Sequence, residues 1–232
     1  HCDADDWVEL DMYEKMYLKA VQVGVEAVCC DMVLEFSNHQ VHLRYSDMYP
    51  DHKLMIDCVA PISVEYCSMC NRMISRDVYT RHDVEPFYGV NMWDDVGLAI
   101  RFRHYIQSCA IINESLYHYN KQNQNSTTRR PTIERVNEQI KCVKEIESFF
   151  EKEGCLLLYR RFLSQLKLVA KEDLFEYDTT LWLNTFPESR KYIGTIKKQC
   201  SRRKYLKMVF VAYFGVFAVA VLRFGRLLKK KK

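Results

Sequence analysis

Glycine and proline are scarce in this chain. Its 232 residues include only 7 Gly and 5 Pro, whereas 48% of the residues are hydrophobic. Disordered chains contain few hydrophobic residues and many residues that favour loops, so this composition excludes a disordered protein and predicts a packed globular one. The length is sufficient for one sizeable domain and an appendage.

We expect no signal peptide in this protein, although the chain contains 10 Cys. Several cysteines lie within apolar runs, where the thiol behaves as a small hydrophobic group: Cys29, Cys30, Cys58 and Cys109. We therefore expect reduced thiols in the cytosol. Cys67 and Cys70 have the spacing of a zinc or redox pair, but no second pair follows at zinc spacing, so metal binding there is not expected.

Acidic clusters lie mostly in the first hundred residues, and the last thirty-five are strongly basic, within a net charge of +4. The basic residues of the C-terminal end are Lys197, Lys198, Arg202, Arg203, Lys204, Lys207, Arg223, Arg226 and Lys229 to Lys232. They flank Met208 to Leu222, fifteen residues without a charge. As a helix, this segment would extend roughly 22 Å, which is short of a hydrocarbon core of about 30 Å.

Positive charge on both sides of this segment argues against a single crossing. We expect the segment to dip into the inner leaflet while its basic flanks bind an anionic membrane surface. The protein would then be cytoplasmic and peripheral on the inner face of the plasma membrane. A buried terminal helix with a solvated lysine tail is the alternative. Nucleic acid is not expected as a partner, because no aromatic stacking positions are interleaved with the basic residues.

Three carboxylates lie within four positions near the start of the chain, in Asp3-Ala4-Asp5-Asp6-Trp7. Like charges this close are costly unless a cation or hydrogen-bond donors hold them. In an extended segment Asp3 and Asp5 would share one face, where they could hold Mg²⁺ or Mn²⁺ against a substrate diphosphate. Alternatively, Asp3 to Asp6 form an acidic turn that caps the next helix.

Periodicity predicts the elements that follow. Apolar residues at helical spacing predict a helix at about 11–24, with Asp11 and Glu14 as a capping box and an end near Gly24. Strands are expected over 27–36, 41–45, 68–74, 110–112 and 116–119, with a short helix over 51–60 and a turn at 75–77. Asp94 and Asp95 stand at the N-terminus of a further helix, where a structural cap is an alternative role for Asp94. A polar loop at 121–130 precedes helices that begin at Pro131, Leu156 and Pro187 and carry no catalytic signal.

Three further blocks follow the acidic segment and its Asp11-Met12-Tyr13-Glu14-Lys15 continuation. They are Cys70-Asn71-Arg72-Met73-Ile74, Trp93-Asp94-Asp95, and Asn113-Glu114-Ser115-Leu116-Tyr117-His118-Tyr119 followed by Asn125-Ser126-Thr127. In order and spacing these blocks resemble family 2 glycosyltransferases of the kind that builds bacterial capsular and cell-surface polysaccharide. The resemblance covers about residues 1–150.

The resemblance implies an α/β fold. Residues 1–130 would form part of a GT-A-type, Rossmann-like glycosyltransferase domain, without the N-terminal half that binds the nucleotide. A helical extension would follow at 131–200, and a basic, apolar, membrane-associating tail at 201–232. The absence of a Gln-x-x-Arg-Trp motif predicts a single-addition transferase rather than a processive synthase.

The implied reaction is an inverting, metal-dependent transfer of a sugar from a nucleotide-sugar donor to the hydroxyl of a saccharide or lipid-linked acceptor. By this resemblance Asp95 is the general base, and Asp3 and Asp5 hold Mn²⁺ or Mg²⁺. Substrate contacts are expected from Asp6, Trp7, Trp93, Asp94, Tyr119 and Ser126, with Asn120 nearby. Asp94 replaces the Glu of the family motif, which shortens this carboxylate by one methylene. A non-catalytic, membrane-associated binding or scaffold fragment is the alternative function.

Overall fold

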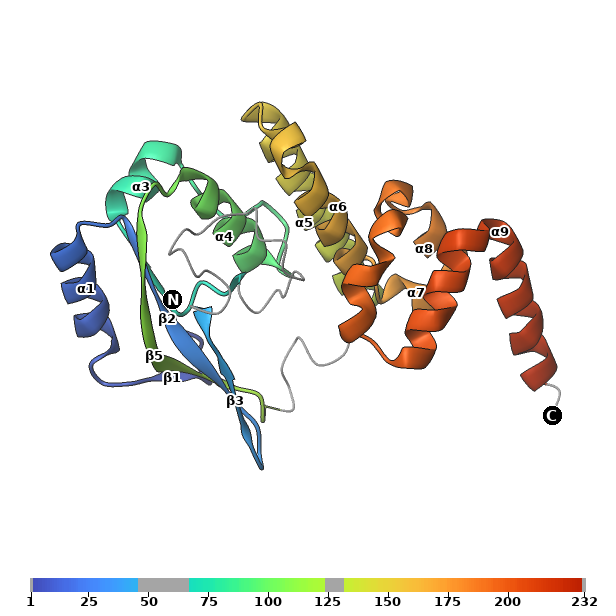
Figure 1. Ribbon diagram of the computed structural model, residues 1–232, viewed down its shortest axis with the longest axis horizontal. Helices are drawn as coiled ribbons and strands as arrows, with labels where there is room; N and C mark the ends of the chain where they lie inside the picture. Colours follow the sequence, from blue (N-terminus) through green and yellow to red (C-terminus); the bar gives the residue numbers. More distant parts are fainter. Residues whose placement is uncertain (1, 46–66, 124–131, 231–232) are drawn as a thin grey trace. The chain divides into compact units, whose positions relative to one another are not determined.

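The computed structural model describes residues 2–45, 67–123 and 132–230 (Figure 1). The chain divides into two compact units, His1–Arg130 and Pro131–Lys232. We call them the N-terminal unit and the C-terminal unit and describe each by itself.

The N-terminal unit contains a mixed sheet of five strands in the described residues, in the order β1–β5–β2–β3, with β4 also paired to β2. The strands are β1 (Trp7–Val8), β2 (Ala27–Glu35), β3 (Gln40–Leu43), β4 (Arg72–Ile74) and β5 (Cys109–Asn120). β2 and β5 are parallel, and the other pairs are antiparallel. Every residue of β2 is buried, as expected for a central strand of a sheet that is covered on both faces.

Helices cover this sheet. Figure 1 shows α1 (Met12–Val23) on one side and α4 (Asp94–Tyr105) on the other. Met12 and Met16 lie one helical turn apart and are fully buried in the core with β2 and β5. α1 ends at Gly24, whose left-handed backbone (φ 69°) lets its N–H bond the Ala20 carbonyl. The helix at 11–24, the strand at 27–36 and its hairpin partner are therefore confirmed.

Three local predictions are wrong. The capping box does not form, because the Asp11 side chain pairs with Lys15 at 3.0 Å instead of capping the helix. Residues 75–77 are not a turn: Ser75 accepts a hydrogen bond from the Asp77 N–H and begins helix α3 (Arg76–His82). The two short strands expected at 110–119 are one strand, β5, whose irregular register opposite Cys30 and Asp31 accommodates the polar residues between them. The helix expected at 51–60 lies outside the described residues.

Every element in the described residues of the C-terminal unit is a helix. Its elements are α5 (Ile133–Lys152), α6 (Leu156–Ala170), α7 (Leu174–Tyr177), α8 (Thr179–Asn184), the 3-10 helix η2 (Pro187–Lys198) and α9 (Arg202–Lys230). The helix expected from Pro187 is present as η2, a 3-10 helix with a kink at Tyr192. Periodicity missed α7 and α8, because helices of 4 and 6 residues are too short to show a repeat.

A buried lysine organises the centre of this unit. The Lys171 ammonium is fully buried and donates to the carbonyls of Trp182, Thr185 and Phe186, at the C-terminal end of α8. Burial lowers the pKa of Lys171 to about 7. Three carbonyl acceptors match the three N–H donors of an ammonium, and positive charge is favoured at the C-terminus of a helix.

Candidate active site

The acidic segment forms a turn rather than an extended strand. The Asp6 N–H donates to the Asp3 carbonyl at 3.1 Å, which closes the turn. The alignment of Asp3 and Asp5 by strand alternation is therefore wrong. The turn does not cap a helix either, because β1 follows it and α1 begins only at Met12. The expected acidic turn is therefore present, but its expected role as a helix cap is wrong.

β5 holds this turn through Asp6. The Tyr117 hydroxyl donates to Asp6 Oδ2 at 2.6 Å, and the Asn120 N–H donates to Asp6 Oδ1 at 2.8 Å. The Asp3 N–H in turn donates to the Tyr117 hydroxyl oxygen at 3.3 Å. Burial raises the pKa of Asp6, although the hydrogen bonds from Tyr117 and Asn120 lower it. Asp6 thus links the turn to the sheet, because both of its carboxylate oxygens accept hydrogen bonds from β5.

A further hydrogen bond to the acidic turn comes from Asn123, which follows β5. The Asn123 amide donates to Asp5 Oδ2 at 2.6 Å, which orients one metal-ligand candidate. Within the described residues, no group of three or more His, Cys, Asp or Glu side chains is arranged to hold a metal ion. Two carboxylates nevertheless suit Mg²⁺ or Mn²⁺ at a diphosphate, because such ions take most of their remaining ligands from phosphate oxygens and water. Asp3 and Asp5 fit that donor set.

Asp95 occupies the first turn of α4, where its Oδ1 accepts the Val96 N–H at 2.7 Å. Burial raises the pKa of Asp95 to about 6, and the neighbouring Asp94 carboxylate acts in the same direction. The Asp3 carboxylate also raises this pKa, whereas Arg72 lowers it. The acidic turn and the start of α4 therefore lie within electrostatic reach of each other.

Sequence reasoning missed three residues of this neighbourhood. Arg72 is a buried cation at the start of β4, 5.9 Å from the centre of the Tyr45 ring. The Cys70 thiol lies against the Tyr117 hydroxyl, and burial raises the pKa of this thiol. Arg72 and Cys70 belong to the sequence block from Cys70 to Ile74. Tyr117 lies in the same strand as Tyr119, which was predicted to contact substrate. The signal that could have found Tyr117 is alternation, which places it on the same face as Tyr119.

Other predicted site residues lie elsewhere. Trp7 pairs with His118 across β1 and β5 and stacks on its ring, with centroids 5.2 Å apart and planes 9° apart. Trp7 therefore shares the face of His118, whereas Tyr117, the Asp6 partner, points to the opposite face of β5. The Tyr119 ring lies 3.9 Å from the Lys121 ammonium.

The two remaining residues of the Trp93-Asp94-Asp95 block stand at the start of α4. Trp93 precedes the helix with a left-handed backbone (φ 70°), and Asp94 is its exposed first residue. Ser126 lies outside the described residues. The structure thus brings Asp3, Asp5 and Asp6 together in one turn, with Asp3 within electrostatic reach of Asp95, and leaves Trp7 on another face.

The chain matches no protein-family model and no curated protein sequence. It is similar to the structure of S. aureus TarS 1-349 in complex with UDP-GlcNAc, with a TM-score of 0.53 and 10% identity, over 90% of this chain and 56% of that chain. A second structure of S. aureus TarS 1-349 gives a TM-score of 0.50 and 9% identity, over 89% of this chain and 54% of that one. The chain thus spans little more than half of these relatives. This similarity in fold confirms the expected α/β, GT-A-type fold with a helical C-terminal part.

Proposed function

We propose that this chain belongs to a glycosyltransferase that uses a nucleotide-sugar donor, with Asp95 as the general base. The observation that carries the proposal is the environment of Asp95, which combines burial, a pKa raised to about 6, and the nearby Asp3 carboxylate. A base is most effective when its pKa lies close to the working pH. Asp95 would be ionised at neutral pH and yet more basic than an ordinary aspartate.

Asp3 and Asp5 are the residues that would hold Mn²⁺ or Mg²⁺. Such an ion, when bound, neutralises the charge that develops on a leaving diphosphate. Asn123 orients Asp5, and the bonds from Tyr117 and Asn120 to Asp6 fix the turn. We therefore assign Asp6 a positioning role, and we keep Trp93, Asp94 and Tyr119 as candidates for contact with the acceptor or donor.

The donor and acceptor follow from chemistry and from similarity in fold. TarS is seen in complex with UDP-GlcNAc, so UDP-sugars are the first donors to assay. A carboxylate base on one side of the reacting carbon and a metal-bound diphosphate on the other suit a single inverting displacement. The acceptor would be a saccharide or a lipid-linked saccharide in the synthesis of cell-surface polysaccharide.

The decisive experiment measures UDP release from UDP-sugars with Mn²⁺, in wild type and Asp95→Asn, over a range of pH. We expect kcat/KM to rise tenfold per pH unit below pH 6 and to level off above pH 7. Asp95→Asn should lower kcat by at least about 100-fold. Asp77→Asn is the matched control, since this exposed carboxylate also stands in the first turn of a helix, α3, and has no role in the proposed site. Turnover that survives Asp95→Asn would overturn the assignment of the base.

Binding of UDP tests the acidic turn without any catalytic step. Titration calorimetry should show UDP binding that depends on Mn²⁺ and that Asp3→Asn or Asp5→Asn weakens. If UDP binds with the same affinity after chelation of divalent ions, the metal assignment is wrong. Binding of UDP without turnover on any acceptor would favour the non-catalytic alternative.

A further inference from the structure

The last helix exposes large apolar side chains on both sides of a break. The backbone of Gly215 (φ 56°, ψ −131°) interrupts α9, and four large residues flank it. Their exposed fractions are 76% for Tyr213, 61% for Phe214, 76% for Val216 and 67% for Phe217. We call these four residues the aromatic corner. Soluble surfaces seldom expose large apolar residues in such a contiguous group.

The opposite face of α9 is packed against its own unit. Met208, Val211, Ala218 and Val219 are buried in one hydrophobic cluster with residues that include Trp182. These four residues lie on both sides of the break, so both halves of the helix are packed. The aromatic corner is therefore held outward by a fixed helix.

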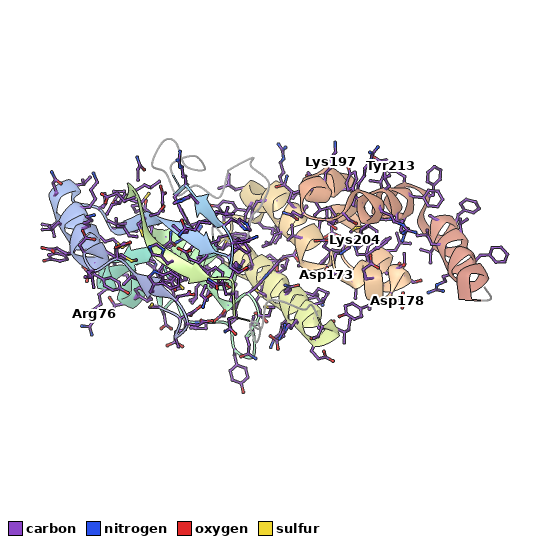
Figure 2. All side chains as sticks on the ribbon, turned by 90° about the horizontal axis from the view of Figure 1, so that it is seen from below. Arg76, Asp173, Asp178, Lys197, Lys204 and Tyr213 are labelled. Atoms are coloured by element: carbon purple, nitrogen blue, oxygen red, sulfur yellow. The ribbon has the colours of Figure 1, made fainter. Side chains whose placement is uncertain are left out.

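Ion pairs hold α9 near both ends of its described side chains. The Lys204 ammonium lies 2.7 Å from Glu172 and 3.0 Å from Asp173, and Figure 2 shows Lys204 and Asp173 directed toward each other. Near the other end, Arg223 donates to the Thr180 hydroxyl at 2.7 Å and lies 3.7 Å from Asp178. Tyr213 extends away from the ribbon in the same view.

This arrangement disfavours a transmembrane crossing. Among the described residues, one helix, Arg202–Phe224 with 23 residues, is long and apolar enough to cross a membrane. The break at Gly215 divides it into two segments, however, and one face of each is occupied by protein. A broken backbone in the hydrocarbon core would lose hydrogen bonds that lipid cannot replace. At the membrane interface water can satisfy the same groups.

The positive charge of the C-terminal region favours an anionic partner. From Lys197 to the C-terminus the sequence contains twelve Lys and Arg residues and no Asp or Glu. Arg202 and Arg203 are exposed at the start of α9. Basic residues beside an apolar surface bind anionic lipids, and aromatic side chains favour the headgroup region.

We propose that the aromatic corner inserts into the headgroup region of an anionic bilayer, with α9 lying on the surface and its exposed Arg202 and Arg203 binding lipid phosphates. The transfer reaction is not a premise of this proposal, which rests on α9 alone. A saccharide acceptor attached to a lipid would be confined to the same surface, which makes membrane binding useful to the proposed enzyme.

Flotation of the whole chain with lipid vesicles tests the proposal. Wild type should float with phosphatidylcholine vesicles that contain phosphatidylglycerol, much less with phosphatidylcholine alone, and less at high salt. The double substitution Phe214→Ser/Phe217→Ser should lower the partition coefficient at least about tenfold. The matched control is Leu157→Ser/Leu158→Ser, which removes two leucines that are 84% and 64% exposed in the same unit. This control should float like wild type.

Depth of insertion provides a second measurement. The indole in Phe217→Trp should be quenched by brominated lipid, and that in Leu157→Trp should not. Asp95→Asn should float like wild type, so failure of the catalytic proposal is distinguishable from failure of this one.

Four results would overturn the proposal. The first is that Leu157→Ser/Leu158→Ser loses as much flotation as Phe214→Ser/Phe217→Ser, and the second is that wild type binds neutral and anionic vesicles equally. The third is that brominated lipid quenches Phe217→Trp and Leu157→Trp equally. The fourth is a dimer in solution that Phe214→Ser/Phe217→Ser dissociates, while vesicles bind neither the wild type nor the variant. The last result would assign the aromatic corner to a second copy of the chain. Circular dichroism must show that each variant keeps the helical content and melting temperature of wild type.

Discussion

Replacement of Asp95 by asparagine should stabilise the N-terminal unit while it abolishes transfer. The folded unit raises the pKa of this carboxyl from 3.8 to about 6, mainly by burial. A difference of about two pKa units corresponds to about 3 kcal/mol of unfavourable free energy in the ionised folded state. Asp95 is only partly buried, so we expect a gain of about 1–2 kcal/mol in the free energy of unfolding. An asparagine Oδ1 can still accept the Val96 N–H, so the helix start is retained.

The sign of the pH dependence is fixed by the same shift. A carboxyl whose pKa is raised on folding stabilises the folded state below its unfolded pKa and loses that contribution as pH rises through the folded value. Wild type should therefore equal the Asp95→Asn variant in stability at pH 3.5 and below. It should fall behind between about pH 4 and pH 6, and the difference should be complete by about pH 7.

Urea unfolding, monitored through the hydrogen exchange of the β2 and β5 amides, measures the stability of the N-terminal unit alone. Asp77→Asn is the control, because Asp77 is exposed and stabilises the N-terminus of α3 by about 0.3–1 kcal/mol. The control should therefore be slightly destabilised. If Asp95→Asn is less stable than wild type, or if its gain in stability does not change with pH, then burial of the ionised Asp95 carboxylate does not destabilise the folded unit as we infer.

Three further predictions concern single side chains. Tyr117→Phe removes a donor to the partly buried Asp6 carboxylate, so unfolding should become easier by about 1–3 kcal/mol and Mn²⁺-dependent UDP binding should weaken more than kcat falls. Lys171→Met leaves buried carbonyls without their ammonium and should lower the free energy of unfolding of the C-terminal unit by about 2 kcal/mol, as measured by thermal denaturation. Gly215→Ala should cost about 1–3 kcal/mol in the same assay from backbone strain alone, because no atom lies within 4 Å of the added Cβ. Each is contradicted by stability equal to wild type.

Elements with a local cause were predictable from the sequence. The helix that buries Met12 and Met16 and the buried strand at 27–35 follow from periodicity, and both are found. The capping box failed because Lys15 competes for the Asp11 carboxylate and also binds Glu114, a partner far along the chain. A motif of four residues contains no information about such a competitor.

The candidate site was only partly predictable for the same reason. The types of residue were recognisable, but the shape of the acidic turn depends on Tyr117, which lies 111 positions from Asp6. Tyr117 and Tyr119 share a face of β5, so the sequence alone cannot choose between them. The environment of Asp95 likewise depends on Arg72 and Asp3, which only the folded sheet brings near it.

The parallel pairing of β2 with β5 has a consequence for the order of folding. β2 ends at Glu35 and β5 begins at Cys109, so this pair forms only after a long crossover that contains β3, β4, α3 and α4 has closed. Closure of such distant segments is slow. The acidic turn depends on β5 for its shape, and it therefore matures at the end of folding. A newly made chain should remain unable to capture a divalent ion and nucleotide there until nearly all of this unit has formed.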